Sequence, residues 1–148
     1  MTITFCVTQV KEMMTPHPEM ISPTATLQQA ARRMKSVKCG ALPVGTENKL
    51  KGIITDRDIV IRILAEGKNP TTEKVGDHMS APVFACNEDD TLEDAAEKMQ
   101  QHKVSRLIVR NHEGKVTGIL SFGSILRNDA SPKEVAGVVK HACGPIAI

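Results

Sequence analysis

The chain contains one sequence pattern twice, and this repeat limits the folds that it can adopt. The two copies span residues 10–55 and 75–121. Each has an apolar residue and Met at its start, a Thr-Leu pair, an Ala pair and Met, an apolar run, and Gly–apolar–apolar–Thr or Ser. The offset between copies is 65 residues from Val10 to Val44 and 66 from Gly52 onward, so one residue is inserted in a loop. Such a period predicts a repeated supersecondary unit whose copies bury a shared core.

Composition bounds the size and the partners. The chain has 148 residues, which suits one compact body or two small halves. Aromatic residues make up 2%, with no Trp or Tyr, so a bound ring would rest on aliphatic side chains. The net charge is +2 and the basic residues are spread along the chain. Because nucleic-acid binders use aromatic platforms or basic stripes, no nucleic-acid partner is expected.

The hydropathy pattern gives an expectation about location. No apolar run approaches the roughly 20 residues of a membrane span. The first ten residues lack the positive start, apolar stretch and cleavage site of a secretory leader. We therefore expect a cytoplasmic protein that does not enter a membrane.

Cysteine and histidine spacing does not indicate a metal centre or a catalytic site. None of the four cysteines, Cys6, Cys39, Cys86 and Cys143, belongs to a Cys-x-x-Cys pair. We expect inert thiols, with a redox-dependent disulfide as the open alternative. The five histidines show no ligand spacing, and no Ser-His-Asp or Cys-His arrangement is legible. The sequence therefore predicts a protein that is not an enzyme and holds no metal or catalytic cofactor.

Hydrophobic periodicity places a long helix in each repeat. One helix is expected from Thr24 or Thr26, with apolar residues at i, i+3, i+4 and i+7. The other follows Thr91, where Asp94 three residues later approximates a capping box. The apolar positions are Leu27, Ala30, Ala31 and Met34 in the first helix and Leu92, Ala95, Ala96 and Met99 in the second.

Strands and shorter helices follow in the same order in both repeats. Strands are expected at residues 41–44 and 50–55 around a turn, and at 107–109 and 115–120 around a second turn. A helix is expected at residues 58–64. A final helix begins at Ser131-Pro132-Lys133-Glu134, where Ser is the N-cap and Glu is at N3. Its apolar face, Val135, Val138, Val139 and Ala142, is expected to pack on its own domain or, alternatively, on a second subunit.

These features together resemble the CBS-domain pair, or Bateman module. The resemblance rests on two β-α-β-β-α units, each closing with Gly–apolar–apolar–Thr or Ser before a helix, and covers residues 8–128. The segment Gly52–Val60 and Met14-Thr15-Pro16 look most like small stand-alone bacterial two-CBS proteins. The implied fold is α/β, with pseudo-twofold symmetry and an added C-terminal helix. The implied boundaries are 8–68 for repeat 1, 69–128 for repeat 2 and 129–148 for the tail.

The resemblance also implies a ligand. CBS pairs bind adenosine-containing molecules in clefts between the repeats. There, the Asp of the motif Gly–apolar–apolar–Thr-x-x-Asp accepts hydrogen bonds from the ribose hydroxyls. Repeat 1 has the full set in Gly52, Thr55 and Asp58. Repeat 2 has Ser121 and Ser124 at the last two positions, so the family pattern predicts one intact and one degraded site. AMP is the favoured ligand, ahead of ADP, ATP, NAD and S-adenosylmethionine.

Further positions carry over by register. The strand Glu19-Met20-Ile21 and Thr15-Pro16 should frame the adenine, residues 41–43 should supply an apolar wall, and Arg106 should reach phosphate. The expected ligand-binding residues are Thr15, Pro16, Met20, Ile21, Ala41, Leu42, Pro43, Thr55, Arg57, Asp58 and Arg106.

Other interpretations of the same residues stay open. Asp58 lies in the first turn of a helix, where a carboxylate is favourable without a ligand. Arg106 could pair with Asp58 or Glu19 instead of a phosphate. The function expected is a non-catalytic sensor of an adenosyl ligand, acting as a homodimer on an unknown regulated protein. The alternative is a ligand-free dimerisation scaffold with a vestigial site.

Overall fold

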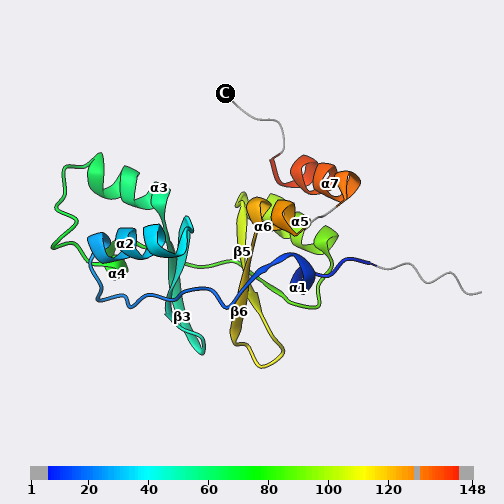
Figure 1. The fold of residues 1–148 in the computed structure, drawn as a ribbon, viewed down its shortest axis with the longest axis horizontal. Helices are drawn as coiled ribbons and strands as arrows, with labels where there is room; N and C mark the ends of the chain where they lie inside the picture. Colours follow the sequence, from blue (N-terminus) through cyan, green and yellow to red (C-terminus); the bar gives the residue numbers. More distant parts are fainter. Residues whose placement is uncertain (1–6, 129–130, 144–148) are drawn as a thin grey trace, which may run out of the picture. The chain divides into compact units, whose positions relative to one another are not determined.

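The chain folds into two compact units with a mixed α/β content. The computed structural model describes residues 7–128 and 131–143 (Figure 1). Unit 1 combines residues within Met1–His17 with residues within Phe84–Ile148, and unit 2 is Pro18–Val83. Each unit is built around a small sheet with helices.

The sheet of unit 1 has four strands in the order β1-β6-β5-β4. They are β1 (Thr15–Pro16), β6 (Val116–Ser121), β5 (Arg106–Arg110) and β4 (Ala85–Asn87). The β1–β6 and β5–β6 pairs are antiparallel, and β4 runs parallel to β5. The long helix of repeat 2 connects β4 to β5, as a parallel pair requires.

In its described part, unit 1 also contains the helices α1 (Val10–Met13), α5 (Leu92–His102), α6 (Phe122–Arg127) and α7 (Pro132–Cys143). Helix α7 packs on α5 and α6, and Val138 is buried in the same core as Met99 and Leu120. The described part of the apolar face of α7 therefore packs within its own unit. Serine at its N-cap exchanges hydrogen bonds with Glu134, which confirms the expected capping box.

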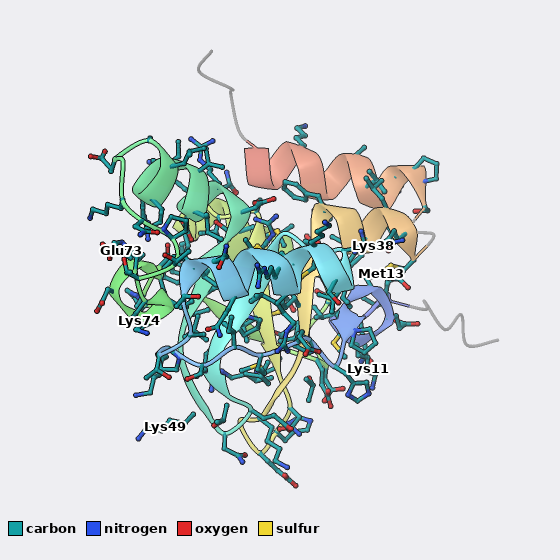
Figure 2. All side chains as sticks on the ribbon, turned by 60° about the vertical axis from the view of Figure 1, so that its left-hand side comes forward. Lys11, Met13, Lys38, Lys49, Glu73 and Lys74 are labelled. Atoms are coloured by element: carbon teal, nitrogen blue, oxygen red, sulfur yellow. The ribbon has the colours of Figure 1, made fainter. Side chains whose placement is uncertain are left out.

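Unit 2 repeats this arrangement with a two-stranded sheet of β2 (Ala41–Thr46) and β3 (Lys49–Thr55). Lys49 stands at the turn of this hairpin (Figure 2). Single bridges continue the sheet on both sides, because Ile21 pairs in parallel with Val44 and Ser80 pairs antiparallel with Ile53. The order Ser80-β3-β2-Ile21 therefore corresponds to β1-β6-β5-β4.

The helices of unit 2 are α2 (Leu27–Val37), α3 (Asp56–Ile59), the π-helix η1 (Val60–Leu64) and α4 (Val75–His78). Leu27, Ala30 and Met34 of α2 are buried with Leu42, Ile54 and Ile63. This core is aliphatic throughout.

Local sequence signals account for the two long helices, as predicted. The side chain of Thr26 accepts from the Gln29 N–H at α2, and that of Thr91 accepts from the Asp94 N–H at α5. Each helix ends at a lysine in the left-handed conformation, Lys38 or Lys103.

Three expectations about elements are corrected. The apolar segment at residues 58–64 is a short α-helix followed by a π-helix, which leaves Val60 and Leu64 exposed. The expected strand at residues 19–21 is reduced to one bridge at Ile21. Strand β2 continues two residues beyond 44 because Thr46 pairs with Lys49.

The short segment at the start of each repeat packs with the body of the other repeat. Helix α1 and β1 lie in unit 1, where Val10 N–H donates to Asp90 O at 2.8 Å and His17 N–H to Thr117 O at 3.1 Å. Helix α4 lies in unit 2, where its first N–H donates to Ala25 O at 2.8 Å. The boundaries 8–68 and 69–128 describe the sequence repeat and remain a prediction, since the compact units group residues differently.

Candidate functional site

The junction between β3 and α3 presents the motif residues Thr55 and Asp58. Thr55 is the N-cap of α3, and its Oγ1 accepts a hydrogen bond from Asp58 N–H at 3.1 Å. In return, Asp58 Oδ2 accepts from Thr55 N–H at 3.0 Å. This reciprocal pair is a capping box, so both residues have a structural role before any ligand is considered.

Asp58 keeps one carboxylate oxygen outside the capping box. Its Oδ1 lies 3.5 Å from Arg62 Nη2, and 13% of its side chain is exposed. Because a carboxylate offers about four lone-pair positions, these two contacts leave room for hydroxyl donors. Asp58 therefore acts as helix cap and ion-pair partner and can still accept from a ligand.

The expected apolar wall lies beside this junction on β2. Ala41 pairs with Thr55 in the sheet register, and the neighbouring Asp56 N–H donates to Gly40 O at 3.0 Å. Ala41, Leu42 and Pro43 are all buried. The side chain of Leu42 is part of the core, so what it offers outward is backbone.

Met20 and Ile21 lie along a different hollow of unit 2. A cavity of about 430 Å³ follows α2 and is lined by both residues together with Arg32 and Arg33. Ile21 is buried and its N–H donates to Pro43 O at 3.0 Å. Thr55 and Asp58 do not line this cavity, so the structure does not bring all the predicted residues of unit 2 into one pocket. Arg57 is exposed on α3.

Three of the predicted residues belong to unit 1. Thr15 and Pro16 form β1, opposite Ile119 and Gly118 of β6. Arg106 opens β5 opposite Ser121, at the register position that Ala41 occupies opposite Thr55. Thr15 Oγ1 accepts from Arg127 Nη2 at 3.4 Å.

Ser124 takes the place of Asp58 in repeat 2 and has no exposed surface. Its hydroxyl accepts from Ser121 N–H at 2.9 Å and donates to Ser121 O at 2.9 Å. The same capping geometry is therefore built without charge, and the hydroxyl has no route to a ligand.

The ion pairs of unit 2 bear on the alternatives for Asp58 and Glu19. Within that unit, Asp58 pairs with Arg62, and Glu19 pairs with Arg33. Arg62 is not among the residues predicted from the sequence, although it lies four residues after Asp58, the spacing at which helical side chains meet.

Titratable clusters elsewhere are small. Glu73 Oε2 lies 2.8 Å from His78 Nε2, and the hydrogen bond from His78 lowers the pKa of Glu73. Glu73 stands next to Lys74 in the loop before α4 (Figure 2). Across residues 7–128 and 131–143, no three His, Cys, Asp or Glu side chains come together as metal ligands.

The described cysteines are unpaired. Cys39 is exposed, and Cys86 is buried, which raises the pKa of its thiol to about 12. Cys6 and the side chain of Cys143 lie outside the described part, so their pairing stays open. None of the described helices is long and apolar enough to cross a membrane.

The chain belongs to the CBS-domain family. The CBS domain model matches residues 10–65 and 75–131, one copy for each repeat. The CBS domain-containing protein YhcV of Bacillus subtilis (strain 168) is 38% identical over 128 residues, which cover 86% of this chain and 89% of the relative.

Solved structures agree with this assignment. The crystal structure of Hypoxic Response Protein I with two coordinated zinc ions is 30% identical, with a TM-score of 0.70 over 81% of this chain and 98% of the other. The crystal structure of CBSX2 in complex with AMP is 26% identical, with a TM-score of 0.66 over 81% and 94%. The protein is thus similar to CBS pairs that were crystallised with different ligands, zinc ions in one and AMP in the other.

Proposed function

We propose that this CBS pair is a non-catalytic regulatory module that binds an adenine nucleotide, AMP first, through Asp58. The observation that carries the proposal is the partly exposed carboxylate of Asp58, whose Oδ1 is held outside the capping box. The vicinal hydroxyls of a ribose can donate hydrogen bonds to such a carboxylate. The similarity to CBSX2, crystallised with AMP, supports the choice of ligand.

The other predicted residues are assigned contacts with different parts of the nucleotide. The Thr55 hydroxyl lies one turn from Asp58 and would contact ribose or phosphate. The backbone of residues 41–43 would border the base. Met20, which is partly exposed, lines the separate hollow beside α2 and keeps only the role that the family resemblance gives it. Thr15, Pro16, Arg57 and Arg106 keep the roles that the family resemblance gives them, with Arg106 for phosphate.

The test compares two neighbouring carboxylates. The melting temperature is measured for the wild type, Asp58→Asn and Asp56→Asn with AMP, ADP, ATP, NAD, S-adenosylmethionine and GMP. Asp56 is exposed in the same turn and is the matched control. A ligand at 100 times its Kd adds about 2.7 kcal/mol of stability.

We expect an adenosyl compound to raise the melting temperature of the wild type and Asp56→Asn but not of Asp58→Asn. GMP has the same ribose, so an equal shift with GMP would show that the site recognises ribose and phosphate and not adenine. Equal shifts in all three proteins would place binding elsewhere, and no shift with any adenosyl compound, in protein free of carried-over ligand, would reject it.

A specific observation supports a scaffold as the second candidate. Val60, Ile61 and Leu64 of η1 are 50%, 50% and 73% exposed, and Leu126 of α6, the equivalent of Val60, is 60% exposed. These exposed apolar side chains, of which Val60 and Leu126 stand at one matching place in the two repeats, suit a contact with another copy of the chain. Light scattering on the wild type and Leu64→Glu tests this contact, because a dimer held through η1 loses mass in the variant and an unchanged mass excludes the contact. The nucleotide panel then separates the two candidates, since only a sensor is stabilised by a ligand.

A further inference from the structure

Arg62 of η1 makes three contacts that run from the candidate site to the end of unit 2. Its Nη2 lies 3.5 Å from Asp58 Oδ1 and 3.1 Å from Ser80 Oγ, and its Nη1 donates to His78 O at 2.6 Å. Ser80 is paired with Ile53 of β3 and stands three residues before the boundary of unit 2 at Val83. One side chain therefore touches both the proposed ribose acceptor and the segment through which the chain leaves the unit.

Equivalent hydrogen bonds to a short segment recur in unit 1, and we call such a set of bonds a grip. Asn128, which corresponds to Arg62, donates to Met13 O at 3.3 Å, and Met13 corresponds to His78. Arg127 Nη2 lies 3.4 Å from Thr15 Oγ1, and Thr15 corresponds to Ser80. The recurrence shows that holding the segment is a structural task in both repeats.

The two repeats differ in what else holds the gripping side chain. Asn128 donates to the backbone oxygen of Ser124 at 2.8 Å, and Ser124 is uncharged and fully buried. Arg62 instead faces the Asp58 carboxylate, and 43% of its side chain is exposed. Among the described residues, it is in repeat 1 that the gripping side chain faces a carboxylate that a ligand could reach.

Arg62 also has room to change position. A hollow of about 340 Å³ in unit 2 is lined by Arg62, Lys68, Asp77 and His78, among others. A guanidinium released from Asp58 could swing into this hollow without displacing the core. Because a surface ion pair is weak, hydroxyl donors on Asp58 can compete with it.

We propose that Arg62 links occupancy of Asp58 to the segment His78–Ser80. This inference rests on the proposed function. Ribose hydroxyls on Asp58 Oδ1 take over the oxygen that orients Arg62, so its hold on His78 O and Ser80 Oγ loosens. By reciprocity, a protein without the Arg62 guanidinium binds the nucleoside more tightly.

The experiment uses adenosine, which is neutral, so that loss of a positive charge does not itself weaken binding. Calorimetry gives its affinity for the wild type, Arg62→Met and Asn128→Ala. Hydrogen exchange follows the Ser80 amide, which donates to Ile53 O at 2.9 Å and reports local opening. Asn128→Ala removes the corresponding grip in unit 1 and is the matched control.

We expect Arg62→Met to bind adenosine about threefold more tightly than the wild type, the effect of one surface ion pair. Saturating adenosine should speed exchange at Ser80 in the wild type and in Asn128→Ala. In Arg62→Met the exchange should already be fast and should not respond to adenosine. Unchanged or weaker affinity in Arg62→Met, or the same exchange response as the wild type, overturns the link and leaves Arg62 as a structural residue.

A last variant separates failure of the link from failure of the proposed function. Asp58→Asn removes the charge that orients Arg62, so the Ser80 amide should exchange faster with no ligand present. If the wild type binds neither adenosine nor AMP, the proposed function fails while this result still supports the link. If Ser80 exchange in Asp58→Asn equals that of the wild type, the link is overturned whatever the ligand does.

Discussion

At the scale of single residues, Ser124 and Asp58 occupy the same position in the two repeats with different surroundings. The Ser124 hydroxyl is buried and bonded to both backbone groups of Ser121, whereas Asp58 reaches solvent. We expect Ser124→Asp to lose about 3 kcal/mol of unfolding free energy, since a buried carboxylate would face the Ser121 carbonyl. It should gain no nucleotide binding. Urea unfolding checks the stability and calorimetry checks the binding.

Ser124→Ala is the matched control, because it removes the same hydrogen bonds without adding charge. Its expected loss is about 1 kcal/mol. If Ser124→Asp were as stable as the wild type and bound AMP, the second repeat would hold a usable site.

Cys86 gives the molecule a pH dependence in the alkaline range. Burial raises the pKa of its thiol from 9.0 to about 12, and Asp90 adds to the shift. Below pH 9 the thiol is neutral in both states and stability is unaffected. Above pH 9 the unfolded thiol ionises while the folded one stays protonated, so unfolding free energy falls by about 1.4 kcal/mol per pH unit.

The measurement is urea unfolding of the wild type and Cys86→Ala between pH 8 and pH 11. The difference between the two proteins should be constant up to pH 9 and then shift in favour of Cys86→Ala. A difference that stays constant across the whole range would contradict the shifted pKa.

At the scale of elements, local sequence signals were enough to predict the two long helices. The π-helix and the contacts of Arg62 could not be predicted in this way. Thr26 and Thr91 each cap a helix whose apolar spacing is regular, so α2 and α5 could be bounded from sequence. The π-helix was missed because an apolar pattern of five residues does not distinguish i→i+4 from i→i+5 bonding. The Arg62 contacts were missed because His78 and Ser80 lie 16 and 18 residues away in sequence.

Gly52 is a motif residue at which close packing requires glycine. A Cβ there would lie 2.6 Å from Met79 Sδ and 2.8 Å from Ser80 O, since the segment after α4 pairs antiparallel with β3 at this point. Gly118 meets Met14 Sδ and Thr15 O in the same way in unit 1. Gly52→Ala should therefore lower the unfolding free energy by about 1–3 kcal/mol through overpacking.

Thermal unfolding of Gly52→Ala and Gly137→Ala tests this explanation. Gly137 lies in α7, and outside its own helix backbone and chain neighbours no described atom lies within 4 Å of an added Cβ, so its substitution should be neutral or should stabilise. Equal stability of Gly52→Ala and the wild type would show that β3 and the segment at Ser80 can separate without cost.

At the scale of the whole molecule, one unit is formed by a continuous stretch of chain and the other by two separate stretches. Unit 2 is the continuous stretch Pro18–Val83, whereas unit 1 needs residues from both ends of the chain. In unit 1 the buried Val10 and Met13 belong to the same core as Leu107 and Leu120. Removing the first 17 residues would leave that core open and strand β6 without its neighbour β1.

We therefore expect a fragment of residues 18–83 to unfold cooperatively in urea, and a fragment of residues 84–148 not to do so on its own. Adding a peptide of residues 1–17 should restore cooperative unfolding to the second fragment, because it supplies Val10, Met13 and β1. The same peptide with Val10→Asp is the control and should fail, since Val10 has no exposed surface. Circular dichroism follows both titrations. Cooperative unfolding of residues 84–148 without any peptide would mean that the first segment is bound by unit 1 but is not part of its folding unit.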